Sequence, residues 1–199
     1  MNYFVTGIDT DSGKTLVSAI LCAATGFDYW KPVQAGFPKD SDTIKSLLPE
    51  TVVHTEQYVL KTPASPHAAA KIDGVNITLA SFLLPKKDGL VVEGAGGCLV
   101  PLNDTDFVVD LFPQLYAEII LVADLYLGSI NHTLLSAHLL KTRGYRVKGI
   151  IFNGPSNPES ERIILKHTNY KYLLRIDREK EVSAATVKKY SELLRTSLT

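Results

Sequence analysis

The N-terminal stretch constrains the fold of this chain more than any other part of the sequence. Residues 3–6 form a short apolar run, Tyr-Phe-Val-Thr, and the segment Gly-Ile-Asp-Thr-Asp-Ser-Gly-Lys-Thr follows it at residues 7–15. Residues 16–24 are rich in Ala and Leu and contain no Pro, which favours a helix. A strand, a Gly-bounded loop that ends in Gly-Lys-Thr, and a helix together form the setting of a phosphate-binding loop.

The chemistry of such a loop is specific. Its backbone N–H groups curl around phosphate oxygens, and the start of the next helix adds unpaired donors and a partial positive charge. Lys14 would add a full charge, and the Thr15 hydroxyl could hold a magnesium ion that bridges the phosphates. Five residues separate Gly7 from Gly13, whereas the common motif has four. The alternative is a Gly-containing turn with Lys14 in solvent; we interpret the segment as a nucleoside triphosphate site.

Length and charge narrow the class of protein. The 199 residues predict a single domain, residues 1–199, with enough chain for a substantial core. Lys plus Arg and Asp plus Glu number 21 each, so no global positive charge favours nucleic acid or an anionic membrane as a partner. No signal-like or membrane-spanning run is found, so we expect a cytoplasmic protein. Cys22 and Cys98 could pair, but free buried thiols fit a reducing compartment better.

Beyond the first helix, apolar runs alternate with helical patterns. This alternation predicts an α/β fold, with a mainly parallel β-sheet flanked by helices on both faces as in P-loop NTPases. The simplest topology places the second strand beside the first. The expected strands cover residues 28–33, 89–93, 119–123, 147–152 and 172–176, and the expected helices cover residues 39–48, 107–116, 130–143, 159–167 and 183–194.

Polar residues follow several of the expected strands. They lie in the first loop, at residues 31–36, at residues 93–97, and at Asn153 with Gly154. Ligands of a parallel sheet collect at the carboxyl ends of its strands. The coincidence of these clusters predicts one site at that edge of the sheet.

Two acidic residues are candidate metal ligands. Glu93 closes an apolar strand, as a magnesium carboxylate does in many nucleotide enzymes, and the glycines after it would let the backbone approach a phosphate closely. The alternative is a Gly-rich turn whose acid faces solvent. Asp42 is a weaker candidate, because an acid at the start of a helix is usually a cap. Thr15 and one carboxylate would leave water to complete the octahedral coordination of magnesium.

Lys31 and Asn153 are candidate ligand-binding residues. Lys31 could be a solvated charge at a strand end. If the second strand neighbours the first, its ammonium group instead approaches the first loop and stabilises negative charge on a transferred group. Asn153 ends a buried strand, and its amide could bind the donor and acceptor atoms of adenine. The alternative is an Asn that caps the turn before Gly154.

Taken in order, these residues resemble the dethiobiotin synthetase family. The resemblance covers the first three quarters of the chain, and the longer spacing of the first loop is itself typical of that family. The matching segments are residues 3–15, Lys31-Pro32-Val33, Ser41-Asp42, Ser65-Pro66-His67, residues 92–97, residues 127–132 and Asn153.

The resemblance implies an ATP-, Mg²⁺- and CO₂-dependent ring closure in biotin biosynthesis. The substrate would be 7,8-diaminopelargonic acid, one amine of which takes up CO₂ as a carbamate. The carbamate would attack the γ-phosphorus of ATP, and the second amine would attack the resulting carbamic-phosphoric anhydride to give dethiobiotin and phosphate. The family is homodimeric, with the substrate site at the interface.

The resemblance also implies roles for individual residues. Lys14 and Lys31 would stabilise the carbamate and the phosphoryl group, and Thr10 and Asp11 would face the substrate amines. The Mg²⁺ ligands would be Thr15, Asp42 and Glu93. The nucleotide would contact Asp11, Ser12, Gly13, Lys14, Thr15, Leu16, Asp42, Glu93, Gly94, Ala95, Gly96, Asn153 and Gly154, and the substrate would contact Thr10, Lys31, Ala35 and, across the interface, Gly128, Ser129, Ile130 and Asn131.

Two positions depart from the family pattern. Ala35 stands where the family usually has a serine that contacts the substrate, and Gln34 could compensate. Leu174-Arg175-Ile176-Asp177 stands where the family tends to have Gly-x-Ile-Pro over adenine, which leaves the selectivity for ATP open. One competing hypothesis is a P-loop ATPase of the switch or partitioning type that acts through a protein partner. Another is a different small-molecule amide ligase with the same loop and sheet.

Overall fold

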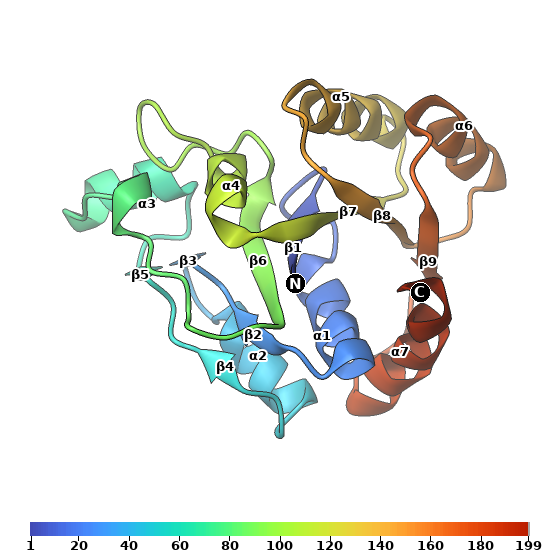
Figure 1. The fold of residues 1–199 in the computed structure, drawn as a ribbon, viewed down its shortest axis with the longest axis horizontal. Helices are drawn as coiled ribbons and strands as arrows, with labels where there is room; N and C mark the ends of the chain where they lie inside the picture. Colours follow the sequence, from blue (N-terminus) through green and yellow to red (C-terminus); the bar gives the residue numbers. More distant parts are fainter. Residues whose placement is uncertain (199) are drawn as a thin grey trace.

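A parallel sheet of seven strands forms the centre of the protein in a computed structural model, which describes residues 1–198 (Figure 1). The strand order is β4-β2-β6-β1-β7-β8-β9, and every neighbouring pair is parallel. The strands are β1 (Asn2–Gly7), β2 (Asp28–Trp30), β4 (Val53–His54), β6 (Leu90–Gly97), β7 (Ala117–Asp124), β8 (Val147–Asn153) and β9 (Tyr172–Ile176). The predicted α/β class is confirmed.

Helices cover both faces of the sheet (Figure 1). One face carries α1 (Lys14–Thr25), α2 (Asp40–Leu47) and α7 (Ala184–Leu198). The other carries α3 (Pro66–Asp73), α4 (Phe112–Leu115), α5 (Ser129–Thr142) and α6 (Pro158–Thr168), together with the short 3₁₀ helices η1 (Leu79–Ser81) and η2 (Val108–Leu111). Within residues 1–198, no helix combines the length and the apolar character needed to cross a membrane.

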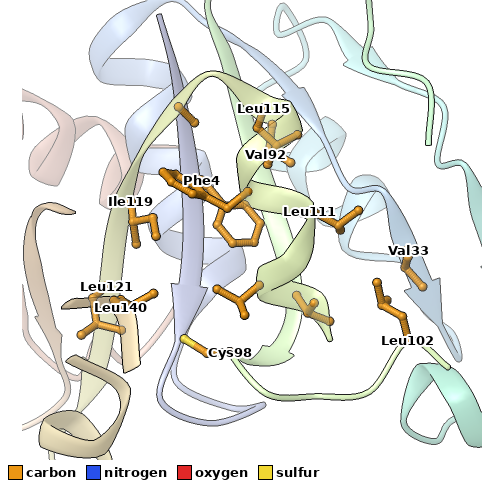
Figure 2. Close-up of a cluster of buried hydrophobic side chains, with 14 of the residues drawn as sticks. Phe4, Val33, Val92, Cys98, Leu102, Leu111, Leu115, Ile119, Leu121 and Leu140 are labelled. Atoms are coloured by element: carbon orange, nitrogen blue, oxygen red, sulfur yellow. The ribbon is translucent and has the colours of Figure 1, made fainter. Parts of the chain in front are cut away.

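Successive side chains of the central strands enter two different apolar cores. On β1, Phe4 packs into the core beneath α4 and α5, whereas Tyr3 and Val5 pack toward α1 and α7. Figure 2 shows Phe4 in the first core, with Val92 and Ile119 from the neighbouring strands. Because both faces are buried, these strands are continuous apolar runs in the sequence rather than alternating ones.

The second predicted strand, residues 28–33, is wrong in two respects. It is two short strands, because β2 ends at Trp30 and β3 (Val33–Ala35) pairs with β5 (Tyr58–Leu60) in a separate two-stranded sheet. Pro32 lies at the break, where its missing N–H prevents a continuous ladder. In addition, β6 lies between β1 and β2, so the second strand does not neighbour the first. The longer strand β6 therefore takes the central place beside β1.

The predicted helix over residues 107–116 is also corrected. This segment forms η2 and then the single turn of α4, with Pro113 in the first turn of α4 and Tyr116 in a left-handed conformation at its end. Proline fits only the first turn of a helix, so a continuous helix across residue 113 would lose a hydrogen bond. The expectation for the cysteines is confirmed, since Cys22 and Cys98 are free and buried.

Gly149 on β8 lies against the segment that leads into β9. A Cβ atom at this position would collide with the Lys171 carbonyl oxygen and lie 2.6 Å from Leu173 Cγ. We predict that Gly149→Ala lowers the free energy of unfolding by roughly 1–3 kcal/mol, because the β8–β9 pairing must shift to admit the methyl group. Urea denaturation measures the change. Gly97→Ala is the control, since its Cβ would meet nothing closer than 3.4 Å; equal losses in both variants would contradict this account.

Candidate active site

The loop between β1 and α1 is wound around the ammonium group of Lys14. Lys14 Nζ donates hydrogen bonds to the carbonyl oxygens of Asp9 and Thr10, both at 2.8 Å, and Ser12 Oγ donates to the Asp9 oxygen at 3.0 Å. The side chain of Lys14 is buried. The loop therefore holds its cation beside the start of α1, and the alternative of a solvated Lys14 is wrong.

Asn153, at the carboxyl end of β8, supports this loop from the side. Its Nδ2 donates to the carbonyl oxygen of Ser12 at 2.9 Å. Gly13 has a φ of 92°, and a Cβ there would collide with the Asn153 amide. Both the backbone conformation and this close approach require glycine. Asn153 thus lies at the loop as expected, and its contact with adenine stays a prediction.

Glu93 joins three elements at the carboxyl edge of the sheet. Its side chain is 1% exposed. Oε1 accepts hydrogen bonds from Thr15 Oγ1 at 2.9 Å and from Lys31 Nζ at 3.0 Å, and Oε2 accepts one from the Tyr29 hydroxyl at 2.9 Å. A buried carboxylate is stable only with such partners. The alternative in which Glu93 faces solvent is wrong.

Lys31, directly after β2, is buried as well. It forms ion pairs with Glu93 at 3.0 Å and with Asp40 at the start of α2. Burial alone would lower the pKa of Lys31, but the negative charges of Glu93 and Asp40 outweigh that effect and the pKa is raised. Lys31 therefore remains an ammonium ion. It approaches the first loop through Glu93 on the intervening strand β6, and the alternative of a solvated edge charge is wrong.

A cavity of about 680 Å³ opens beside these residues. Its volume is in the range of small-molecule sites. Both buried ammonium groups and the Glu93 carboxylate face it. The polar and small residues that line it include Thr10, Asp11, Gly13, Lys14, Thr15, Lys31, Gln34, Ala35, Gly36, Asp40, Ser65, Glu93, Ala95 and Gly96.

Several predicted site residues do not line this cavity. Asp42 is exposed on α2, so the structure does not bring it to the Glu93 cluster and its metal role stays a prediction. Gly94 packs against Val108 and Phe4 instead of facing the cavity. The remaining predicted contacts outside the lining are Ser12 and Leu16 near the loop, Asn153 and Gly154 at the end of β8, and Gly128, Ser129, Ile130 and Asn131 at the start of α5.

The structure adds two residues that the sequence did not single out. Tyr29 donates to Glu93, and Asp40 pairs with Lys31. Asp40 stands two positions before Asp42, and residues two apart point to different sides of a helix. Which of the two acids faces the cavity depends on the residue at which α2 begins, and that residue is Asp40. For Tyr29, the available signal is a hydroxyl two residues before Lys31 on the strand that leads to it.

The protonation of Lys14 predicts a pH dependence. Burial lowers the pKa of Lys14 to about 8, although the Glu93 charge opposes this shift. The ammonium group is therefore lost as pH rises through about 8, and a bound triphosphate would raise the pKa again by adding negative charge. We expect triphosphate affinity in titration calorimetry to fall by up to about tenfold per pH unit above pH 8, with proton uptake on binding. The Lys14→Arg variant, which stays charged, should show a flat profile; a flat wild-type profile would contradict this prediction.

Solved structures with a similar fold are P-loop ATPases of low sequence identity. The ParA family ATPase from Chlorobium tepidum TLS has a TM-score of 0.54 and 16% identity, and the match covers 99% of this chain and 96% of that one. The septum site-determining protein MinD from Pyrococcus horikoshii OT3, solved in complex with Mg-ADP, has a TM-score of 0.57 and 15% identity over 100% and 93% of the two chains. At these identities the likeness shows the fold alone, a P-loop NTPase-like α/β sheet.

Several proteins are much more similar to this chain in sequence than these solved structures are. Residues 1–186 match a family described as an AAA domain. The ATP-dependent dethiobiotin synthetase BioD of Cytophaga hutchinsonii is 60% identical over 194 residues, which are 95% of this chain and 94% of that protein. The enzyme of the same name from Christiangramia forsetii is 45% identical over 202 residues, 99% and 97% of the two chains. This chain therefore belongs to the ATP-dependent dethiobiotin synthetase family.

Proposed function

We propose that the protein closes the ureido ring of dethiobiotin from 7,8-diaminopelargonic acid and CO₂, with conversion of ATP to ADP and phosphate, as a step of biotin biosynthesis. Family membership supports the ATP dependence and the biosynthetic role. The observation that supports the reaction itself is the shared cavity of Lys14, Lys31 and Glu93, in which two ammonium groups and a carboxylate face one small-molecule space. Phosphoryl transfer depends mainly on positioning and charge neutralisation, which such a site provides.

Magnesium fits the oxygen donors of the cavity. Thr15 Oγ1 and Glu93 Oε1 lie 2.9 Å apart on its wall, next to Lys14. Mg²⁺ prefers hard oxygen ligands and keeps several of its waters, so one hydroxyl and one carboxylate with phosphate and water suit it. Thr15 and Glu93 would hold the ion, with Asp42 as a predicted further partner. When bound, Mg²⁺ neutralises charge on the phosphates.

Lys31 is suited to hold the carbamate. One amine of the substrate adds to CO₂, and loss of a proton leaves a carbamate anion. Lys31 Nζ pairs with Asp40, which is half-buried and at the cavity wall. The carbamate can take over this ion pair while Glu93 keeps the ammonium group in place. Thr10 and Asp11 line the same cavity. The Asp11 carboxylate would accept hydrogen bonds from the amines, and the Thr10 hydroxyl would accept or donate them.

Lys14 is suited to the phosphoryl transfer. A carbamate oxygen forms a bond to the γ-phosphorus as the bond to ADP breaks, and Lys14 Nζ can leave its two loop carbonyls to neutralise the charge on the transferred group. The second amine then attacks the carbonyl carbon of the anhydride. The C–O bond to phosphate breaks, the amine loses a proton, and the cyclic urea is complete.

We assign the substrate tail to a homodimer interface. Large apolar side chains are exposed around the start of α5, among them Leu99, Leu127 and Leu135. Large contiguous apolar patches on a protein surface mark interaction sites. The first N–H groups of α5, at residues 128–131, would bind the substrate carboxylate of the partner subunit.

The competing hypotheses receive less support. A partitioning-type ATPase shares the fold, but its identity to this chain is near 15%, whereas the synthetase relatives reach 60%. A different amide ligase would share the loop and the sheet but does not account for the ordered segments of the synthetase family. A cytoplasmic location remains part of the proposal, in keeping with two free buried thiols.

Lys31→Ala tests the reaction. We expect turnover to fall about 100-fold or more, because the substitution removes a fixed positive charge from the transition state. The assay is phosphate release with ATP and Mg²⁺, with and without diaminopelargonate and bicarbonate. Lys87→Ala is the matched control, since Lys87 pairs with Asp28 at the opposite end of β2. Phosphate release that ignores the diamine would refute the synthetase function, and an unaffected Lys31→Ala would remove Lys31 from the mechanism.

Leu127→Asp tests the interface. A charge in this exposed apolar group should disfavour association, so sedimentation is expected to shift from dimer toward monomer. The Michaelis constant for the diamine should rise by about tenfold through loss of contacts to the partner, while ATP affinity stays within about twofold. Leu193→Asp is the control, because Leu193 is exposed on α7 at the other face of the sheet. A Leu127→Asp protein with wild-type assembly and substrate affinity would rule out this interface.

A further inference from the structure

We propose that Tyr29 is a positioning residue of the active site, whose buried hydroxyl fixes the Glu93 carboxylate so that its Oε1 atom faces Thr15 and Lys31. The proposal rests on the proposed function, in which Glu93 helps to hold Mg²⁺ with the nucleotide. Tyr29 itself does not line the cavity in which the substrate and the metal ion would bind. Its influence passes through Glu93.

The register of the sheet places the phenol against Glu93. Tyr29 on β2 pairs with Val91 on β6, and Glu93 follows two residues later on the same strand. Residues two apart in a strand share a face, so Tyr29, Val91 and Glu93 all point toward the side covered by α1. A diagonal neighbour is within reach of an aromatic side chain. The Tyr29 hydroxyl accordingly donates to Glu93 Oε2 at 2.9 Å.

The hydrogen bonds to the two oxygen atoms of Glu93 show what Tyr29 contributes. Thr15 and Lys31 both donate to Oε1, so together they fix the position of one carboxylate oxygen. Rotation of the carboxylate plane is restrained by the hydrogen bond from the Tyr29 hydroxyl to Oε2. If Thr15 turned to a metal ion, Tyr29 and Lys31 would be the donors left to hold the carboxylate.

The neutral hydroxyl of a tyrosine also suits a position beside the negative charge of Glu93. The hydroxyl of tyrosine ordinarily has a pKa of about 10. Tyr29 therefore stays neutral and donates its proton at physiological pH. It orients Glu93 without cancelling the charge that would attract a divalent cation. Outer hydrogen-bond partners of metal ligands typically change metal affinity by about 10–100-fold when they are removed.

Tyr29→Phe tests the proposal, because it deletes one oxygen and keeps the ring. The measurement is titration calorimetry of Mg²⁺ into protein saturated with a non-hydrolysable ATP analogue. We expect Mg²⁺ to bind about tenfold more weakly than in the wild type, while affinity for the analogue without Mg²⁺ stays within about twofold. A merely structural role would move both affinities or neither. Mg²⁺ affinity within about twofold of the wild-type value would overturn the proposal.

Tyr170→Phe is the matched control. It also removes a phenol hydroxyl with a hydrogen bond, here to the Ala137 carbonyl oxygen at 3.2 Å, between α5 and the start of β9 and away from the Glu93 cluster. Mg²⁺ affinity should be unchanged in this variant. The wild-type titration reports on the proposed function. If Mg²⁺ does not bind with the analogue even there, the metal role of Glu93 is refuted and this proposal with it, whereas normal Mg²⁺ binding by Tyr29→Phe refutes the positioning role alone.

A double-mutant cycle, measured as Tm in thermal unfolding, tests the same contact without a ligand. It also applies if the Tyr29→Phe protein is too unstable for titration. In the wild-type background, the Tyr29→Phe substitution would leave a buried anionic oxygen without its donor. In the Glu93→Gln background the oxygen is neutral, so the same substitution should lower Tm less. Equal falls of Tm in the two backgrounds would show that Tyr29 does not act on the Glu93 charge and would overturn the proposal.

Discussion

The arrangement of the active site depends on one carboxylate, that of Glu93, which is buried at the carboxyl edge of the sheet. Glu93 is all but inaccessible to water, and an unpaired charge at such a depth would cost several kcal/mol. Its partners must therefore be built into the fold. They come from the start of α1, from β2, and from the residue directly after β2, so that one side chain links the start of α1 to Lys31. The central position of β6 makes this possible, because the strand lies between the two elements it connects.

The class of fold could be predicted from the sequence because burial on both faces leaves a plain signal. Continuous apolar runs at residues 89–93 and 119–123 correspond to the central strands β6 and β7. Strand order could not be predicted in the same way, because periodicity reports which face a residue occupies and not which strand lies beside it. The short strands β3, β4 and β5 were missed or merged, since two or three residues are too few to show a period.

The site was predicted in part for the same reason. Lys14, Thr15, Lys31 and Glu93 follow strands or open a helix, and the common edge of a parallel sheet brings them together. The places of Asp40 and Tyr29 in the site depend on the residue at which α2 begins and on the register of β2 against β6. A shift of one residue at the start of α2 would change which acid faces the cavity, and a shift of one residue in β2 would turn Tyr29 to the other face of the sheet. The dimer, the metal, the adenine contact of Asn153 and the single-domain organisation of residues 1–199 stay predictions.

A crystal structure with a non-hydrolysable ATP analogue, Mg²⁺ and the diamine bound is the most direct test of the role of Glu93. We predict Lys14 Nζ at the phosphates instead of the carbonyls of Asp9 and Thr10, and Glu93 Oε1 turned to the metal, either directly at about 2.1 Å or through one water. Lys31 Nζ should lie at the reacting amine with its bond to Glu93 intact. A triphosphate bound away from the loop, or a Glu93 carboxylate turned away from the metal, would contradict the central role given to Glu93.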